Sequence, residues 1–575
     1  LQPQSGQTEC RCRLSERFPQ PGGDSQLPGK QAGLAPADPP EIMVGDIPNI
    51  YPYIVDDVGE GIQAKRRGRG VILDYLTPPL READLYHEYS RIHDLFHKYE
   101  IATANGSETA SEYRRQIEKL ARETGVAADL RLRETDVFDD EVMERIHLYL
   151  HEIDDNSLPY GLHTYGKVDE SEAVDDTVGL IMKQNPAADA NAVRRDLESS
   201  PVREMDNFIR ALNGAYIPAG EGNDPLRNLA AIPTGKNFYG FSPAKVPSKA
   251  AWEIGKRAAE KMIADKLEKT GNYPNKVGVV LWATETTRNE GVHESSILWL
   301  MGVEPVWDAT ERVTGCRVVP GSRLKRPRID VLINPSGLYR DMFPDKLIFL
   351  DDAVQQAMAQ TDIENLIARN RDLIKAALLA EGLAVAEAET RSRFRIFTEE
   401  VGSYGNGVSE MTSASGLWDA DEDVSKVYLN RVQFAIGQGQ WGVPVKETFV
   451  ENLRGVDIAV HSRSSNVIGI IDTDDFFQYL GGLSLAVKNV RGEAPDTLVT
   501  MHRRKDELMV EDIAKTIGRE MRTRYLNPQW IEGMKCDNYA GARQMADFAE
   551  NLWGWQVPAE SAAENGYEVF AAAAQ

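Results

Sequence analysis

Two short apolar runs decide the fold class of this chain: KVGVVLWA at residues 276–283 and IDVLIN at residues 329–334. Both runs are rich in β-branched residues and end in polar turns, which is typical of buried strands. Helical patterns lie between and after them, at residues 294–301 and 351–381. This alternation of strand and helix predicts an α/β unit built on a parallel sheet.

This unit is one part of a chain of 575 residues, a length typical of about three or four domains. Residues 41–270 are predicted to be mainly helical, with a long loop rich in glycine and proline. The α/β unit spans residues 271–400, and residues 401–575 are predicted to form an α/β and helical C-terminal part. Residues 1–40 lack a hydrophobic period, so we expect a disordered leader there. The predicted fold class is multidomain α/β, with parallel-sheet units and extensive helical segments.

The composition excludes several kinds of partner. The chain has 65 Lys and Arg against 89 Asp and Glu, a net charge of −24 that repels the phosphates of nucleic acid. Of its 4 cysteines only Cys10 and Cys12 lie close together, which favours a reducing, cytoplasmic location over a disulfide framework. No apolar run approaches the roughly 20 residues of a membrane helix, so we expect no membrane span.

Polar clusters follow both strands of the predicted sheet. TETTRNEGVHE occupies residues 284–294 and PSGLYRD occupies residues 335–341. In open parallel sheets, ligands bind beyond the carboxyl ends of the strands. The acidic residues alone would fit the first turn of a helix, where the dipole favours them. Arg288 and His293 in the same short segment favour a ligand site.

A third cluster, DTDDFFQY at residues 472–479, follows a strand candidate at residues 467–471. Three carboxylates within four residues are costly unless they are solvated or paired with a cation. Such carboxylates can hold a divalent ion or accept protons, although a solvated acidic turn is the simpler alternative. Nearby aromatic residues, including Tyr404 and Tyr479, are candidates for the floor of a flat pocket, or else for ordinary core packing.

Two further patterns are interpreted as structural. His93 and His97 are four residues apart on a predicted helix, but Asp94 stands where a zincin motif needs Glu. We therefore predict solvated surface histidines. Gly235 and Lys236 lack the upstream glycine and the following Ser or Thr of a Walker A loop, so we expect no ATPase site in this chain.

Longer segments carry a resemblance to a known family. WATETTRNEGVHESSILWLMGVEPVWD precedes RPRIDVLINPSGLYRDMFP, and LPYGLHTYG, PTGKNFYGF, GSYGNG and IDTDDFFQYLGGLSLAV occur in the family's order. The chain resembles the large, tetrapyrrole-binding (H-type) subunits of cobaltochelatase and magnesium chelatase. The run HSRSSNVIGIIDTDDFFQYLGG is more similar to the cobaltochelatase-like members.

This resemblance implies an ATP-dependent chelatase subunit of cobalamin biosynthesis. It would insert Co²⁺ into hydrogenobyrinic acid a,c-diamide, with a separate AAA+ ATPase subunit and its partner subunit using Mg-ATP. One alternative is a magnesium chelatase subunit that inserts Mg²⁺ into protoporphyrin IX. The other is a truncated, non-catalytic module that binds a tetrapyrrole or acts as a scaffold.

The same resemblance assigns the site residues. One group is expected to take up pyrrole protons or guide the metal: Glu285, Glu290, His293, Asp472, Asp474 and Asp475. A second group is expected to bind the macrocycle, with its arginines pairing with groups on the rim: His163, Arg288, Arg340, Asp341 and Arg463. Tyr404 and Tyr479, from the aromatic pattern, complete the predicted substrate-binding set.

The resemblance also implies an expectation about the ends of the chain. In the family, a His-Gly-x-x-Glu stretch that forms an acid/base pair directly precedes LPGK. Here LPGK occupies residues 27–30, and residues 22–26 read GGDSQ. We therefore expect a C-terminal fragment, cut at both ends, with little chelatase activity on its own.

Overall fold

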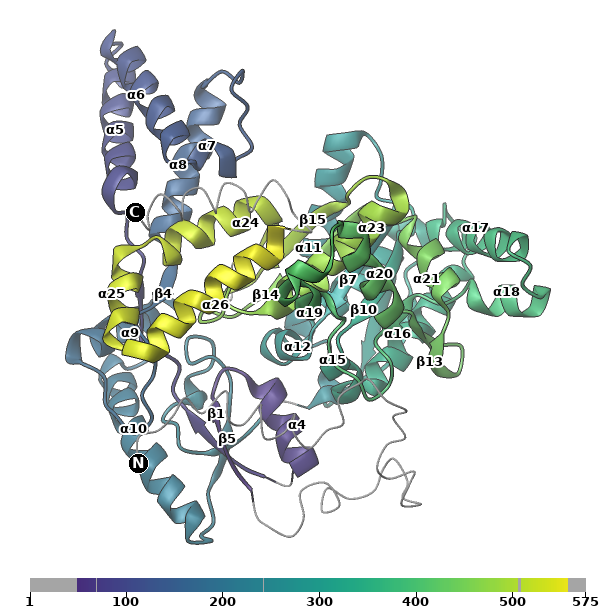
Figure 1. Cartoon of the computed structure of the whole chain (residues 1–575), viewed down its shortest axis with the longest axis horizontal. Coiled ribbons are helices and arrows are strands. Elements are labelled where there is room, and N and C mark those ends of the chain that lie inside the picture. The colour runs from purple at the N-terminus through teal and green to yellow at the C-terminus, as the bar shows by residue number, and fades with distance from the viewer. Residues whose placement is uncertain (1–48, 69, 241, 505–507, 557–575) are drawn as a thin grey trace. The chain divides into compact units, whose positions relative to one another are not determined.

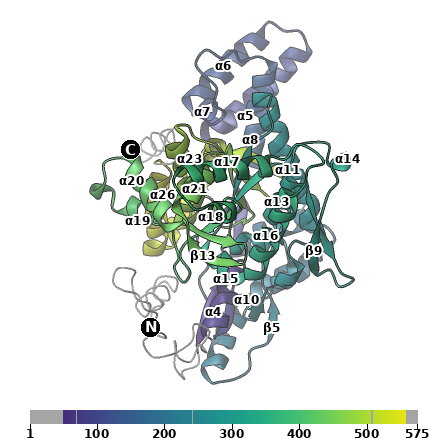
Figure 2. The same ribbon diagram turned by 90° about the vertical axis from the view of Figure 1, so that its right-hand side faces the viewer.

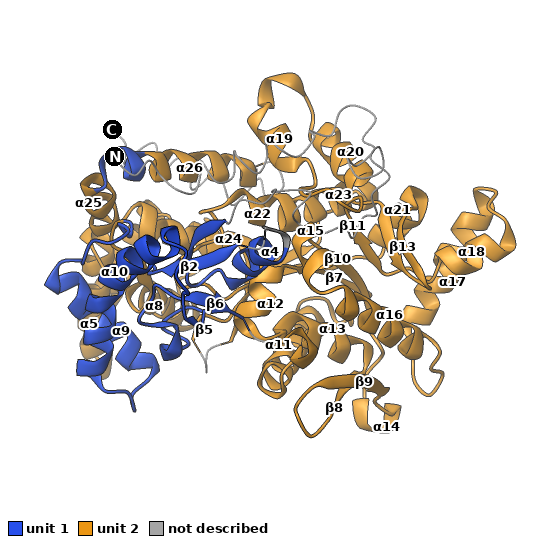
Figure 3. Ribbon diagram, turned by 90° about the horizontal axis from the view of Figure 1, so that it is seen from below, with its two compact units in different colours: residues 1–77, 162–240, 537–542 blue, residues 78–161, 241–536, 543–575 orange. Residues whose placement is uncertain are grey.

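The computed structural model describes residues 49–68, 70–240, 242–504 and 508–556 (Figure 1). The predicted leader, the Cys10 and Cys12 pair and the LPGK segment lie outside the described residues. The chain forms two compact units, each made of segments far apart in sequence (Figure 3). The first comprises residues 1–77, 162–240 and 537–542, and the second comprises residues 78–161, 241–536 and 543–575.

The first unit is a small α/β assembly. Its elements are β1 (Ile50–Ile54), α4 (Val58–Gly68), β2 (Val71–Tyr75), α9 (Ser171–Gln184), α10 (Ala190–Leu212), β5 (Ala219–Glu221) and β6 (Asn237–Tyr239). Strands β1 and β2 are parallel, and α4 connects them. Phe238 of β6 packs in a core with Val58 and Ile72, so residues far apart in sequence share one apolar centre.

The second unit is organised around one sheet of eight strands, in the order β13-β12-β11-β10-β7-β14-β15-β16. The strands are β7 (Lys276–Leu281), β10 (Asp330–Pro335), β11 (Ile396–Thr398), β12 (Phe434–Gly437), β13 (Gln440–Pro444), β14 (Ile458–Arg463), β15 (Asp496–Met501) and β16 (Met509–Asp512). Strands β11, β10, β7, β14 and β15 are parallel, and antiparallel strands close the edges. The multidomain α/β prediction is confirmed.

The strand order creates a switch point beside β7. From β7 the chain adds β10 and then β11 on one side, and later returns to add β14 and β15 on the other. Every residue of β7, β10 and β14 is buried, as expected for strands covered on both faces. In folds of this type, the crevice at the carboxyl ends of the two strands flanking the switch point binds ligands. Here those strands are β7 and β14.

Helices cover both faces of this sheet. They include α11 (Lys249–Thr270), α12 (Ala283–Asn289), α13 (Val292–Met301), α15 (Gly337–Met342), α16 (Pro344–Met358), α17 (Leu366–Ala380), α20 (Asp421–Arg431), α21 (Lys446–Leu453) and α23 (Gly482–Arg491). Helix α13 packs against α11 and α16, whereas α20, α21 and α23 pack together; Figure 2 shows the first group to the right of the second. At Gly255 of α11, a side chain would collide with Ser295 of α13, so glycine permits their close approach.

A helical subdomain belongs to the same unit. It contains β3 (Leu80–Glu82), α5 (His87–Ala104), α6 (Thr109–Glu123), α7 (Val126–Asp129), α8 (Asp140–Asp154) and β4 (Ser157–Pro159). Ile92, Phe96, Ile117 and Ile146 share its apolar core. The helix predicted from the spacing of apolar residues in this region is α5. The last helices of the chain are α24 (Ile513–Glu520), α25 (Pro528–Cys536) and α26 (Asn538–Gln556).

One predicted strand is wrong. Residues 467–471 form turns and loop rather than a strand. The Ser465 hydroxyl accepts hydrogen bonds from the N–H groups of Val467 and Ile468, and Ile470 donates its N–H to Glu520. Side chains therefore replace a partner strand for this segment. The strand nearest to this segment is β14, which ends at Arg463.

Membrane-spanning helices are absent from the described ranges, where every helix is too short or too polar to cross a bilayer.

Candidate functional site

The carboxyl ends of β7 and β14 are joined by a buried carboxylate. Glu285 lies in α12, the short helix that follows β7 and is buried at every position. Its Oε1 accepts the N–H of Ser464, which follows β14, at 3.1 Å, and the Arg288 guanidinium at 2.9 Å. Glu285 and Arg288 therefore form a buried ion pair at the switch point of the sheet. Glu285 belongs to the predicted catalytic group and Arg288 to the predicted substrate-binding group, and the structure brings the two together here.

Two neutral histidines lie at the same strand ends. His293 begins α13 and His461 belongs to β14, and both are buried. Burial lowers the pKa of each imidazole from 6.5 to about 4, so both rings are uncharged near pH 7. Among the described residues, Nε2 of His293 has no hydrogen-bond partner. The ring of His461 packs between Trp282 and Phe476, with centroids at 5.6 and 4.7 Å.

Two buried acids complete the candidate site, and neither belongs to the predicted sets. Glu294 accepts the hydroxyls of Thr286 and Tyr339, both at 2.8 Å. Glu399 directly follows β11 and accepts the hydroxyl of Thr398 at 2.9 Å. Burial raises the pKa of both carboxyls. Among the described residues, one oxygen of Glu294 has no hydrogen-bond partner, whereas Glu399 also interacts with the hydroxyl of Tyr479.

The sequence carries a partial signal for these two acids. Glu294 ends the polar cluster that follows β7, where the first turn of a helix is the simpler interpretation of an acidic residue. Glu399 follows a strand of only three residues, which is too short to stand out from an apolar pattern.

Arg340 holds a loop in place. Its guanidinium donates to the carbonyls of Glu399 and Glu400 at 3.0 and 3.1 Å, and to that of Ser403 at 3.1 Å. Its Nε donates to Asp341 at 3.0 Å. These bonds fix the segment after β11. The guanidinium is 1% exposed, so it shapes the site from within and has little surface for a ligand.

Tyr404 and Asp341 lie at a more open edge. Tyr404 is 45% exposed, and its hydroxyl donates to Asp341. Tyr479, by contrast, is buried beside Glu399, and burial raises the pKa of its hydroxyl. Glu290 is exposed and adopts a left-handed conformation (φ 62°) between α12 and α13. Glu290 and Tyr404 are thus the predicted residues most open to solvent on this side of the sheet.

The acidic motif does not form a single cation site. Asp472 accepts the Arg524 guanidinium at 2.5 Å and also the Tyr525 hydroxyl. Asp474 accepts the Ser409 hydroxyl at 2.7 Å. Asp475 accepts the amide of Gln478 at 3.0 Å.

Arg463 is similarly committed. It forms a buried ion pair with Glu520 of α24, with both side chains 1% exposed. It joins β14 to α24, whereas Asp472 joins the turn after β14 to the segment that follows α24.

His163, the remaining predicted residue, lies in the first unit. Its Nε2 is 2.9 Å from Glu204, and the two side chains are 2% and 0% exposed. Glu204 also accepts the N–H of Leu76 and the hydroxyl of Thr234. Nearby Asp74 has a pKa raised to about 7 by burial. This unit therefore carries its own buried acid–histidine network.

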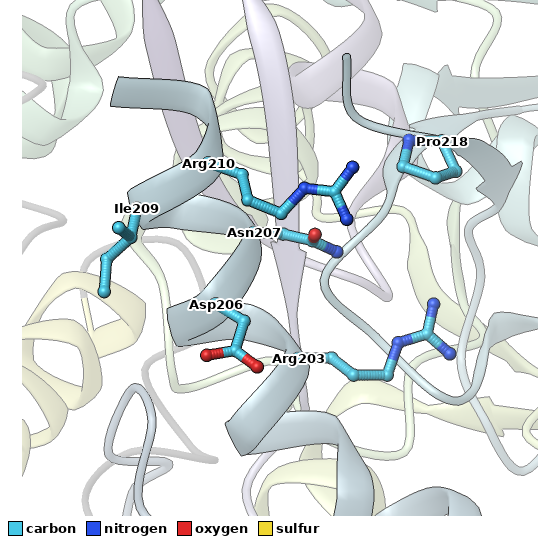
Figure 4. A pocket seen from close by; sticks show the side chains of 6 residues that line it. All are labelled: Arg203, Asp206, Asn207, Ile209, Arg210 and Pro218. Carbon is cyan, nitrogen blue, oxygen red and sulfur yellow. The ribbon is translucent and has the colours of Figure 1, made fainter. Parts of the chain in front are cut away.

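The first unit also has a cavity of about 490 Å³. Figure 4 shows Arg203 and Arg210 pointing from α10 toward the segment that carries Pro218. Asn207 of its lining donates to the carbonyl of Gly235 at 2.6 Å. The cavity contains none of the predicted site residues.

The fold and the strand-end cluster define an α/β protein with a buried acid–histidine–arginine site at a sheet switch point. Comparison with known proteins identifies its family. The sequence profile of the CobN/Magnesium Chelatase family matches residues 25–194 and 186–573. The chain belongs to this family.

Its relatives include both kinds of chelatase subunit. The aerobic cobaltochelatase subunit CobN of Sinorhizobium sp. is 28% identical over 94% of this chain and 51% of its own length. The H-type magnesium-chelatase subunit of Cereibacter sphaeroides is 30% identical over 92% of this chain and 42% of its own length. The chain thus spans about half the length of these relatives.

A solved structure is similar over the same extent. The catalytic subunit of cobaltochelatase from Mycobacterium tuberculosis has a TM-score of 0.84 and 29% identity. The similarity covers 92% of this chain and 50% of that one. The predicted family is confirmed.

Proposed function

We propose that this chain is the tetrapyrrole-binding and metal-inserting part of a chelatase large subunit. The observation that carries the proposal is the buried cluster of Glu285, Arg288, His293 and Glu294 at the ends of β7 and β14 in a chain of this family. We propose Co²⁺ and hydrogenobyrinic acid a,c-diamide as its substrates, because the relatives include cobaltochelatase subunits.

The chemistry of chelation explains why such a cluster is useful. Metal insertion displaces N–H protons of the macrocycle, so the site needs at least one proton acceptor beside the ring. Burial raises the pKa of Glu294 and of Glu399, so each carboxyl would hold an accepted proton more firmly than an exposed carboxyl does. His293 offers an uncharged nitrogen with no hydrogen-bond partner among the described residues, which can contact the incoming metal.

The exposed residues would form the rim of the site. Tyr404 offers an aromatic face, and Glu290 and Asp341 offer carboxylates that can contact amide or N–H groups of the macrocycle. Arg340 would act as a positioning residue, because it fixes the segment from Glu399 to Ser403. Tyr404 directly follows this segment.

We propose that an AAA+ ATPase subunit and its partner subunit use Mg-ATP to drive the reaction in the cytoplasm. The absence of a Walker A motif in this sequence agrees with that division of labour.

The binding part of the proposal is tested by absorbance titration of the chain with hydrogenobyrinic acid a,c-diamide and, separately, with protoporphyrin IX. We expect a spectral shift with the first and at least tenfold weaker binding for Tyr404→Ala. Tyr216→Ala is the matched control, since Tyr216 is also exposed, at 76%, but lies in the first unit. A preference for protoporphyrin IX would favour Mg²⁺ as the metal, and no shift with either compound would refute tetrapyrrole binding.

Metal insertion needs a second experiment. The chain is mixed with the two partner subunits, Mg-ATP, Co²⁺ and the macrocycle, and metallated product is followed by its absorbance. Product formation that falls at least tenfold in Glu294→Gln would support the proton-acceptor role. Binding without any product would instead identify a non-catalytic tetrapyrrole-binding module.

A further inference from the structure

Four of the nine histidines of the chain gather on two helices outside the strand-end site. His93 and His97 lie on α5, and His147 and His151 lie on α8. Each pair is four residues apart, so both side chains of a pair lie on one face of their helix. The faces meet, with the ring centroid of His93 at 5.9 Å from that of His147 and 5.2 Å from that of His151.

The nitrogen atoms are close enough to share one ion. Ligand atoms of His93, His147 and His151 all lie within 4.8 Å of one another. The Nε2 atoms of His147 and His151 are 3.1 Å apart. Two nitrogens bound to one tetrahedral metal ion at 2.0–2.1 Å are about 3.4 Å apart. Only small side-chain movements would therefore convert this arrangement into a coordination sphere.

The surroundings favour a cation. Among the described residues, Nε2 of His93 is buried and has no hydrogen-bond partner. The carboxylate of Glu100 lies 3.8 Å from both His97 and His147, so a negative charge borders the cluster.

We propose that His93, His147 and His151 bind a divalent transition-metal ion, with His97 at the edge of the site as a further ligand. Imidazole donors select Zn²⁺, Co²⁺ or Ni²⁺ over Mg²⁺, which prefers oxygen ligands. A bound ion would tie α5 to α8 across the core of the helical subdomain. Within the described residues, this is the only group of three or more His, Cys, Asp or Glu side chains placed to share a metal ion.

The test uses the full chain, freed of any affinity tag and treated with a chelator. Zn²⁺ is titrated in competition with a chromophoric chelator, and Co²⁺ binding is followed by its visible d–d absorption. We expect one Zn²⁺ per chain and a tetrahedral-type Co²⁺ spectrum. The double variant His147→Gln and His151→Gln should bind Zn²⁺ at least thirtyfold more weakly.

The matched control is His87→Gln. His87 begins the same helix α5 and is exposed, but it lies outside the cluster, so its replacement should leave the affinity unchanged. His93→Gln provides a second, single replacement with an expected loss of at least tenfold, should the double variant fold poorly. Circular dichroism without metal checks the fold of each variant.

A second readout is thermal. Zn²⁺ should raise the unfolding temperature of the unaltered chain and of His87→Gln, but not that of the double variant. Equal Zn²⁺ affinity of the unaltered chain and a folded double variant would overturn the proposal, as would the absence of binding. Neither measurement includes a tetrapyrrole or ATP, so the result is independent of the proposed chelatase function.

Discussion

The strand-end site and the histidine cluster of α5 and α8 hold their reactive side chains in different environments. At the strand ends, Glu285, Arg288 and His293 are buried, and Glu285 accepts the N–H of Ser464 and the guanidinium of Arg288. On the helices, the histidines are partly exposed, and they contact mainly one another. The strand-end site is part of the core of the second unit, whereas the histidine cluster lies at the surface of the helical subdomain. Changes at the strand ends should therefore affect folding, whereas changes in the histidine cluster should affect binding.

The largest expected effect breaks the buried ion pair. Arg288→Ala leaves the Glu285 carboxylate buried at 3% exposure without this cation, so we expect the free energy of unfolding to fall by about 3–5 kcal/mol. Urea denaturation followed by circular dichroism measures this change. The control is Arg91→Ala, whose pair with Glu88 is 63% and 50% exposed. That variant should lose less than about 1 kcal/mol. Equal losses in both variants would contradict the distinction between core and surface ion pairs.

A smaller effect should appear in the pH dependence of stability. His461 has a pKa of about 4 in the folded chain and an ordinary value of 6.5 when unfolded. Between these values the unfolded chain binds the proton more tightly, so stability is complete above pH 6.5 and falls as the pH drops toward 4. The difference corresponds to about 3 kcal/mol. His461→Gln should flatten this part of the profile, measured as the free energy of unfolding from pH 7 to 4.

His87→Gln is the control variant for this profile, since it removes an exposed histidine instead of the buried one. An unchanged slope in His461→Gln would show that the imidazole does not titrate as its burial requires.

The smallest effect on stability is expected at Glu294. Its carboxyl keeps a proton to higher pH than an exposed carboxyl does, and glutamine retains an oxygen that can accept the hydroxyls of Thr286 and Tyr339. Glu294→Gln should therefore cost about 1 kcal/mol or less in urea denaturation. Glu285→Gln should cost more, because the buried Arg288 guanidinium would lose the carboxylate with which it pairs. The reverse order would contradict this distinction between Glu294, which accepts two hydroxyls, and Glu285, which pairs with a guanidinium.

The sequence predicted the parts of this fold that depend on local pattern. The β-branched runs at β7 and β10 are long and bounded by polar turns, and both are strands of the parallel sheet. The polar segments after them contain Glu285, Arg288 and Glu294, so the location of the candidate site followed from strand order. The strand expected at residues 467–471 failed because apolar composition cannot distinguish a strand from a buried turn whose N–H groups bond to side chains.

Long-range partners could not be predicted in this way. Arg463 and Asp472 were expected to contact a ligand, but they pair with Glu520 and Arg524 of the C-terminal helical region. These partners lie far along the chain, and nothing in a charge pattern specifies which opposite charge a buried side chain will meet. The catalytic or binding roles of the predicted residues remain predictions that the experiments above address.

By itself, the sequence determined the fold class, the family and the segments that end the central strands, because these depend on local periodicity and on ordered motifs. Only the tertiary structure decided which charges are neutralised by partners and which atoms remain open to a ligand. It also brought His93 on α5 together with His147 and His151 on α8, although two other helices separate them in sequence. Helix packing sets that juxtaposition, since the apolar faces of α5 and α8 must bury a common core and thereby fix the neighbouring polar faces in contact.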